Sequence, residues 1–167
     1  DGQDVYRYVR DKAVILRDEN GKAVRVIGAM QDITALKQAE LKLMSERNMM
    51  RTIIDNIPDY VYVKDHQYRH LVNNKAMVKL LGRDSENETL GKTLEAFFPP
   101  AVAKQYLDDD KKVIATGKGV YNREEYTITP EGEKQWLFTT KVPLRDEQGN
   151  VTGLVGVTRD ISFIHQQ

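Results

Sequence analysis

Residues 140–162 read TKVPLRDEQGNVTGLVGVTRDIS, and residues 12–34 read KAVILRDENGKAVRVIGAMQDIT. The two stretches share nine identities in 23 aligned positions, where chance would supply roughly one or two, so they form an internal repeat. Each copy contains an apolar run, a turn that ends in glycine (Gly21 or Gly149), and a second apolar run. This pattern is typical of a β-hairpin whose glycine takes a positive φ angle. The sequence therefore predicts two long antiparallel hairpins of the same design.

The segment between the two copies, residues 35–56, contains no glycine or proline and is rich in helix-forming residues. Its apolar residues recur with a spacing of seven, which predicts an amphipathic helix with a coiled-coil stripe. Pro58 ends this helix, because the residue before a proline is pushed out of the α region. We expect the stripe to form a parallel dimer contact, and packing on its own domain is the alternative. The predicted contact consists of Leu36, Leu43, Met50, Ile53 and Ile57.

The remainder of the chain, residues 58–162, predicts an α+β fold. The pattern indicates five strands of one antiparallel sheet, with helices inserted between strands two and three. Pro100 and Gly117 mark the two ends of the longest helix, since proline favours the first helical position and glycine the position after the last. The expected strands are 60–64, 69–73, 120–128, 134–145 and 152–162, and the expected helices are 74–81, 84–88, 93–97 and 100–116.

Composition narrows the classes of function. Lys and Arg together number 25, as do Asp and Glu, so the chain lacks the basic field used to bind nucleic acid or anionic membranes. No apolar run approaches the roughly 20 residues that a spanning helix needs. The chain has no cysteine, which excludes disulfides, thiolate metal sites and a covalent flavin-cysteinyl adduct. We expect a cytoplasmic location, and the start at Asp1 suggests an excised fragment.

Several short motifs in the second part of the chain give it a family resemblance. They are Asn74-Lys75-Ala76 through Leu80-Leu81-Gly82, then Leu90-Gly91-Lys92-Thr93, and the closing Pro143-Leu144-Arg145-Asp146-Glu147-Gln148-Gly149, Gly156 and Asp160-Ile161-Ser162. In their order and spacing these motifs resemble the PAS family of sensor modules, and the resemblance covers nearly the whole chain.

The resemblance implies a domain organisation. Residues 58–162 would be one complete PAS domain, and residues 1–34 the C-terminal hairpin of an upstream PAS domain. Residues 35–57 would be the linker helix, and residues 163–167 the start of an output linker. Two strands alone are marginally stable in water, so the first hairpin needs a partner or frays.

In PAS domains the long helix lines the ligand cavity, which draws attention to Asp110 at the centre of the apolar face of residues 100–116. A carboxylate in such a place costs several kcal/mol unless it is partnered. We expect an internal partner such as Arg123, Tyr62 or Trp136, and recognition of a ligand amine or hydroxyl is the sharper alternative. Asp108, Asp109, Lys111 and Lys112 are expected on a solvated face.

The predicted ligand-binding set combines this helix with residues that alternate along strands and should share one face. Most such residues are simply core, and any pocket would lie among them. The set consists of Tyr62, Met77, Leu81, Phe98, Tyr106, Asp110, Val113, Arg123, Trp136, Phe138 and Thr140.

The cofactor is unknown from the sequence, and the residues favour none. His66 and His70 lie in a turn and a strand, so they do not share a face as helical metal ligands would, and no metal site is predicted. Haem-binding PAS domains carry their histidine on the long helix, and residues 100–116 contain none. Non-covalent flavin is likewise disfavoured. Glu124 and Glu125 point to opposite faces of a strand, which argues against a carboxylate pair for catalysis.

Both copies of the repeat end in a triplet that the PAS resemblance identifies as the signal-transmission point. It is Asp32-Ile33-Thr34 in the first copy and Asp160-Ile161-Ser162 in the second, where the side chains can cap the following helix or bridge to a neighbouring loop.

The sequence predicts a non-catalytic relay module of a signal-transduction protein, most similar to a sensor histidine kinase. We expect a homodimer, formed through the linker helix and PAS surfaces, that binds a small ligand and contacts neither nucleic acid nor membrane. A ligand-free dimerising spacer is the alternative, and a flavin- or haem-based redox or gas sensor is a more distant one.

Overall fold

A computed structural model describes residues 5–129 and 131–166 of the chain. Residues 1–4 and 167, which fall in the predicted segments 1–34 and 163–167, lie outside the described residues. The chain divides into two units, Asp1–Met50 and Arg51–Gln167.

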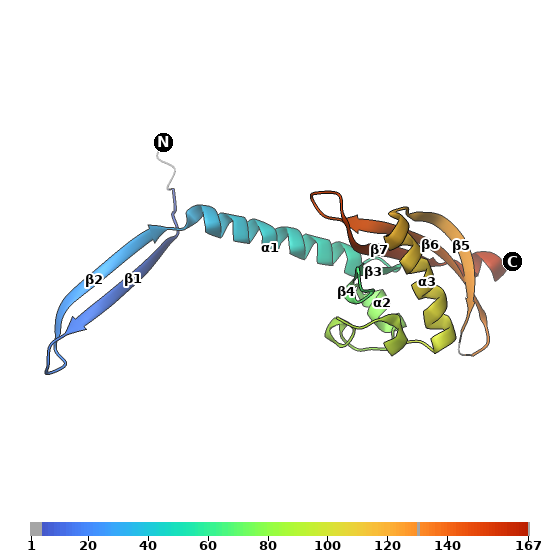
Figure 1. Cartoon of the computed structure of the whole chain (residues 1–167), viewed down its shortest axis with the longest axis horizontal. Helices are drawn as coiled ribbons and strands as arrows, with labels where there is room; N and C mark the ends of the chain where they lie inside the picture. The colour runs from blue at the N-terminus through green and yellow to red at the C-terminus, as the bar shows by residue number, and fades with distance from the viewer. Residues whose placement is uncertain (1–4, 130, 167) are drawn as a thin grey trace. The chain divides into compact units, whose positions relative to one another are not determined.

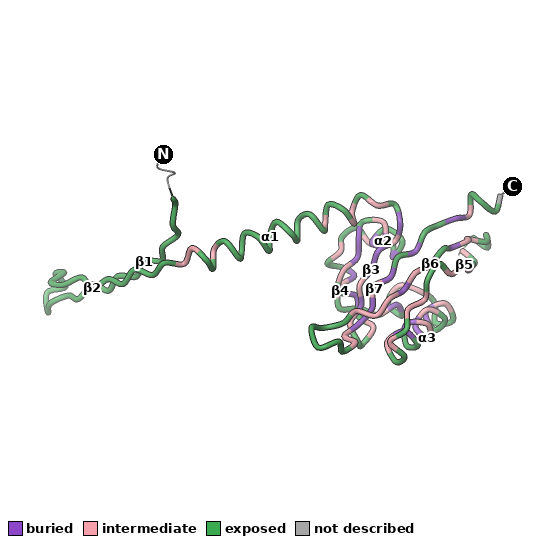
Figure 2. The backbone as a smooth tube through the Cα atoms, turned by 90° about the horizontal axis from the view of Figure 1, so that it is seen from above, coloured by how far each residue is buried: buried purple, intermediate pink, exposed green. Residues whose placement is uncertain are grey.

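The first unit contains a two-stranded antiparallel sheet of β1 (Val9–Arg17) and β2 (Ala23–Asp32), followed by most of α1 (Thr34–Asp55). Every residue of β1 and β2 is exposed, and α1 has no buried residue (Figure 2). The hairpin and helix predicted on either side of the Asp32-Ile33-Thr34 triplet are therefore both present. Their apolar side chains remain uncovered within the unit.

The second unit is a five-stranded antiparallel sheet, with strands in the order β4-β3-β7-β6-β5 (Figure 1). The two N-terminal strands and the three C-terminal strands are separated in sequence by the helices, which confirms the predicted α+β fold. The strands are β3 (Tyr60–Asp65), β4 (His70–Asn73), β5 (Val120–Ile128), β6 (Lys134–Arg145) and β7 (Val151–Asp160). The helices are α2 (Lys75–Leu80) and α3 (Pro100–Thr116), with the 3₁₀ turns η1 (Glu86–Glu88), η2 (Leu94–Ala96) and η3 (Ser162–Gln166).

The helix ends follow the signals in the sequence. Asn74 caps α2, where its Oδ1 accepts a hydrogen bond from the main-chain N–H of Met77 at 3.0 Å. Pro100 is the first residue of α3, and Gly117 ends it with φ of 65°, a left-handed conformation that glycine adopts without steric cost. These signals explain why the predicted span of α3 is confirmed.

The core of the second unit lies between the sheet and α3, which crosses one face of it (Figure 1). Asn74 also ties the end of α1 to this unit, since its Nδ2 donates to the Ile54 carbonyl at 2.7 Å and to the Asp59 carbonyl at 2.8 Å. The buried core residues are Tyr62, Met77, Leu81, Leu94, Ala103, Leu107, Val113 and Leu154.

Candidate functional site

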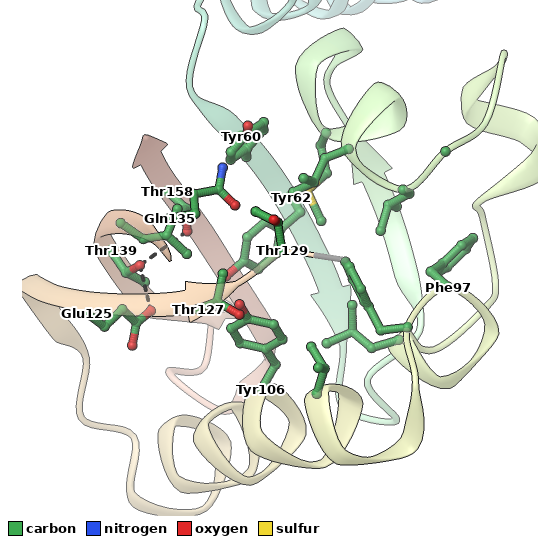
Figure 3. Close-up of a pocket in the computed structure, with 18 of the residues that line it drawn as sticks. Tyr60, Tyr62, Phe97, Tyr106, Glu125, Thr127, Thr129, Gln135, Thr139 and Thr158 are labelled. Atoms are coloured by element: carbon green, nitrogen blue, oxygen red, sulfur yellow. Dashed lines mark hydrogen bonds between the residues drawn. The ribbon is translucent and has the colours of Figure 1, made fainter. Parts of the chain in front are cut away.

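A cavity of about 620 Å³ lies between the sheet and the helical side of the second unit (Figure 3). Its volume falls within the range of roughly 300–1,000 Å³ that is usual for small-molecule sites. The lining residues are Tyr60, Tyr62, Lys64, Met77, Leu80, Leu81, Gly82, Arg83, Leu94, Phe97, Phe98, Pro99, Val102, Tyr106, Glu125, Thr127, Ile128, Thr129, Glu131, Gln135, Leu137, Thr139, Lys141 and Thr158.

The cavity has two chemically different sides. The helical side is mostly apolar and aromatic, with Phe97, Phe98 and Tyr106 among its side chains. The side formed by β5, β6 and β7 carries hydroxyl, amide and carboxylate groups, and Figure 3 shows Glu125 beside Thr139 on this side. Thr139 donates a hydrogen bond to Glu125 at 2.8 Å. A bound molecule would meet an apolar surface on one side and hydrogen-bonding groups on the other.

A buried ion cluster lies where α3 packs against β3 and β6. Asp110 is fully buried on α3, and its two carboxylate oxygens accept hydrogen bonds from Lys64 at 2.6 Å and from Lys141 at 2.8 Å. Lys64 and Lys141 are 2% and 3% exposed, and both line the cavity. Two buried ammonium groups thus share one buried carboxylate, an arrangement that is stable only while all three partners are present.

The cluster continues toward the surface as a chain of alternating charges. Lys141 Nζ lies 3.4 Å from a carboxylate oxygen of Asp109, which also pairs with Arg123. Arg123 then contacts Glu125 at 3.1 Å. Together with Lys64 and Asp110, the chain contains three cations and three carboxylates, so its formal charges cancel.

The two lysines differ in how firmly they hold their charge. Burial lowers the pKa of Lys64, and Asp110 only partly offsets this effect. Burial also opposes the charge on Lys141, but the negative charge that Tyr62 carries when ionised and the carboxylates of Asp110 and Asp109 outweigh it and raise the pKa of Lys141. Lys141 therefore stays protonated at neutral pH, whereas the positive charge of Lys64 is favoured by Asp110 alone.

The Tyr62 ring contacts the main chain at the position where β7 has a glycine. Tyr62 pairs with Gly156 across the sheet, and a Cβ atom at residue 156 would lie 2.1 Å from the ring carbon Cζ. Burial raises the pKa of Tyr62 to about 12, so its hydroxyl is uncharged at neutral pH. Gly156 thus makes room for an uncharged phenol at the wall of the cavity.

His70 lies on β4 next to this region and is fully buried. Its Nδ1 lies 2.8 Å from Asn73 Oδ1, and its ring packs edge-on against Tyr62 and Phe97. Burial, reinforced by the nearby Lys64 ammonium, lowers the pKa of His70 to about 4. His70 is thus a neutral core histidine at physiological pH.

The structure brings five residues of the predicted ligand-binding set to the cavity wall: Tyr62, Met77, Leu81, Phe98 and Tyr106. It places two others behind the wall. Asp110 contacts the lining lysines without lining the cavity itself, and Val113 is buried in the core on the same helix.

The prediction for β6 is wrong by one residue of register. Trp136, Phe138 and Thr140 lie on the opposite face of the sheet, whereas Gln135, Leu137, Thr139 and Lys141 line the cavity. Trp136 instead stacks on His165, with ring centroids 4.1 Å apart. The outward-facing side chains of β6 include the large apolar Trp136 and Phe138, whereas three of the four inward-facing ones are polar, so apolar alternation indicated the wrong face.

The expectation that Asp110 has an internal partner is confirmed, but the candidates named for it, Arg123, Tyr62 and Trp136, are wrong. The structure pairs Asp110 with Lys64 and Lys141, and Arg123 pairs with Asp109 instead of lining the cavity. Asp109 was expected on a solvated face, but it belongs to the ion chain because it pairs with Arg123 and Lys141.

A usable signal for Lys64 was present in the sequence. Lys64 has the same strand parity as Tyr60 and Tyr62, which both line the cavity, so period-two alternation places it on the inner face. The sequence held no comparable signal for Gln135, Thr139 or Lys141, because it does not show which face of β6 the helices cover.

Both triplets take the same local geometry. The carboxylate of Asp32 accepts a hydrogen bond from the main-chain N–H of Thr34 at 2.9 Å, and Asp160 accepts one from Ser162 at 2.9 Å. The hydroxyl of Thr34 accepts from the main chain of Tyr8 at 2.9 Å, as Ser162 does from Trp136 at 2.9 Å. Each triplet is therefore bridged to the first half of its own hairpin, at Tyr8 just before β1 and at Trp136 within β6.

Two further kinds of feature are absent from the residues that the structure describes. There, no group of three or more His, Cys, Asp or Glu side chains is arranged to hold a metal ion. Among the described helices, none combines the length and apolarity needed to cross a membrane.

The chain is similar in sequence to sensor kinases. It is 30% identical over 131 residues to the methanogenesis regulatory histidine kinase FilI of Methanothrix harundinacea, an alignment that covers 78% of this chain and 14% of FilI. The chain therefore spans only a small part of the length of this curated relative.

Two solved structures resemble the fold. The PAS domain of BvgS from Bordetella pertussis matches with a TM-score of 0.56 and 25% identity, over 73% of this chain and 93% of that chain. Vibrio cholerae VqmA, described as a LuxR-type receptor, matches with a TM-score of 0.60 and 25% identity, over 70% and 52% of the two chains. VqmA has also been solved bound to DPO.

The sequence model described as the PAS fold matches residues 54–163, which span the five-stranded sheet, its helices and the cavity between them. With the fold, the family match and the relationship to sensor histidine kinases in agreement, this chain belongs to the PAS family of sensory domains.

Proposed function

We propose that residues 58–162 bind a small molecule in the cavity and pass the resulting change to the helices at the two ends of the domain. The observation that carries this proposal is the cavity of about 620 Å³, since a dimerising spacer would be expected to fill its interior with side chains. The match to VqmA, which has been solved with DPO bound, supports ligand binding by a domain of this kind.

The charges around the cavity favour an uncharged ligand. The buried lysines and Arg123 are already matched by three carboxylates, so an ionic ligand would add an unbalanced charge to a region of low dielectric. Hydroxyl and amide groups on β5, β6 and β7 supply directed hydrogen bonds. The ligand class that fits is a small, uncharged, largely apolar molecule with hydrogen-bonding groups along one edge. The proposal assigns no haem or flavin, and α3 has no histidine for haem.

Native mass spectrometry of the purified chain tests this function, followed by a thermal-shift screen of uncharged metabolites. Val102 lines the cavity, and Ala101 next to it is exposed, so Val102→Trp should block ligand binding while Ala101→Trp leaves it intact. A bound mass or thermal shift that survives Val102→Trp would place the ligand elsewhere. If the native chain binds no compound, the ligand-free spacer reading is favoured.

We also propose that the chain dimerises through α1. Leu43 and Ile53 on the heptad stripe are 68% and 55% exposed, and α1 buries no residue in the chain. Leu43→Glu should convert a dimer to a monomer in light scattering, whereas Lys42→Glu, which introduces the same side chain beside the stripe, should not. A monomeric native chain would contradict the proposal.

In the intact protein, we propose a cytoplasmic, non-catalytic relay module of a larger sensor, most similar to a histidine kinase. Residues 1–34 would then be the last hairpin of an upstream PAS domain. The junction hydrogen bonds that the two hairpins share support this assignment.

A further inference from the structure

Gln135 connects the cavity to the output end of the domain. Its side chain lines the cavity, and its Nε2 donates a hydrogen bond to Asp160 Oδ2 at 3.0 Å. Gln135 also lies next to Tyr60, a second residue of the cavity wall, in Figure 3, and its side chain partly offsets the rise in the pKa of Tyr60 that burial and Asp160 cause. A single side chain thus lines the cavity and contacts the first residue of the second triplet.

The next residue, Trp136, holds the C-terminal turn Ser162–Gln166. The main-chain N–H of Trp136 donates to Ser162 Oγ at 2.9 Å, and its carbonyl accepts from the main chain of Ile161 at 2.9 Å. On the face opposite the cavity, its indole stacks on His165, which also pairs with Glu124 at 2.6 Å. Because Asp160 also accepts the Ser162 N–H, its position helps to hold this turn.

We propose that Gln135 is the positioning residue that couples occupancy of the cavity to the C-terminal turn. A ligand that hydrogen-bonds the Gln135 amide competes with Asp160, and the turn loosens when that hydrogen bond is lost. This coupling rests on the proposed ligand-binding function and adds the route by which binding reaches the output end.

The first copy of the repeat supplies an internal reference. The residue equivalent to Gln135 is Arg7, which forms an ion pair with Asp32 at 2.8 Å. A guanidinium is a stronger partner for a carboxylate than a neutral amide is. Gln135→Arg therefore gives the second copy the ion pair that the first copy has. This ion pair with Asp160 should hold the turn in place whether or not the cavity is occupied.

A double-mutant cycle tests the coupling in the full chain without any ligand. Amide hydrogen exchange at Ile161 and Ile164 reports on the turn, as does the fluorescence of Trp136, the only tryptophan in the chain. Gln135→Ala should accelerate exchange about three- to tenfold, the effect of one lost hydrogen bond. Tyr60→Phe, which removes the cavity-side partner, should accelerate it about two- to threefold. In the Gln135→Ala background, Tyr60→Phe should have no further effect.

Three other variants complete the design. Gln135→Arg should slow exchange and remove the response to Tyr60→Phe. Thr116→Val removes a hydroxyl at the end of α3, outside the cavity, and should leave the turn unchanged, while His165→Ala defines the fluorescence of a released turn.

Equal acceleration by Tyr60→Phe with and without Gln135 would overturn the proposal, as would normal exchange in Gln135→Ala. Uniform acceleration of all amides, including those of β3 and β7, would indicate global destabilisation and also count against it. Because no ligand is used, failure of this coupling is distinguishable from failure to bind a small molecule.

Discussion

The two hairpins of the repeat have equivalent main-chain hydrogen bonds at their turns and junctions but differ in burial. In the turns, Asp18 Oδ1 accepts from the main chain of Lys22 at 2.9 Å, and Asp146 Oδ1 accepts from Asn150 at 2.9 Å. Yet β1 and β2 are exposed throughout, whereas β6 and β7 bury part of their surface in a five-stranded sheet (Figure 2). Local residues therefore determine the geometry of the turn and the junction, whereas burial depends on the other strands and helices that pack against the hairpin.

Two equivalent positions show what the second hairpin gains. Lys141, which belongs to the buried ion cluster, corresponds to Ala13 in the first copy. Gly156, which faces the Tyr62 ring, corresponds to Gly28, where the nearest atom to an added Cβ is the Lys12 carbonyl oxygen at 3.6 Å.

The largest expected effect comes from removing the anion at the centre of the cluster. Asp110→Asn leaves two buried ammonium groups without their shared carboxylate, so the free energy of unfolding should fall by about 3–5 kcal/mol. Urea denaturation measures this change. Asp108→Asn, at a half-exposed position on the same helix, should change it by less than about 0.5 kcal/mol. Equal effects of the two variants would show that the cluster does not hold the second hairpin in place.

The next effect is a pH dependence that belongs to the complete domain. His70 has a pKa of about 4 in the folded state against 6.5 for an unperturbed histidine, so the unfolded state binds more protons between these values. Stability should therefore fall as the pH drops from about 6.5 to 4, by a total of about 3 kcal/mol. Urea midpoints measured across this window test it. His70→Gln should flatten the slope, while His66→Gln, at an exposed position, should preserve it; an unchanged slope in His70→Gln would contradict the assignment.

The glycine pair provides a matched test of the comparison itself. Gly156→Ala forces the Tyr62 ring to move and should destabilise the second unit by about 2 kcal/mol, a typical cost of overpacking. Gly28→Ala meets only an ordinary van der Waals contact and should be close to neutral. Thermal or urea unfolding of both variants checks the difference. A loss of the same size at residue 28 would mean that the first hairpin also packs against another group in solution.

The smallest effect concerns the hydroxyls of the two triplets. Thr34→Val and Ser162→Ala each remove the acceptor of one main-chain N–H, a loss of about 1 kcal/mol that should act locally. Hydrogen exchange should accelerate at Tyr8 in the first variant and at Trp136 in the second. A similar acceleration of exchange in the two variants would show that the two junctions are equivalent. Acceleration in only one of them would show that they are not.

The sequence was sufficient to predict the strands and helices of the second unit, because proline, glycine and Asn74 mark their ends by local steric and capping effects. It was not sufficient for the inner face of β6. Trp136 is a large apolar residue and therefore suggested that its face of β6 is the core. In the structure it instead packs on His165, which comes from the C-terminal turn. The lysine partners of Asp110 come from two strands, β3 and β6, that both pair with β7 and lie far from α3 in the sequence. Tertiary pairing of this kind leaves little trace in local periodicity.

The junction on β6 has a consequence for how such modules diverge. The hydrogen bonds at Trp136 use its main-chain atoms, so they place no demand on the neighbouring side chains that face the cavity. The repeat records this freedom: Arg7, Val9, Asp11 and Ala13 stand where the second copy has Gln135, Leu137, Thr139 and Lys141, while both triplets begin with Asp-Ile. Substitution on one side of a single strand can thus create a new chemical preference without rebuilding the joint between strand and helix. Duplicated copies of the module can then drift apart in the molecules they favour and still be joined in series.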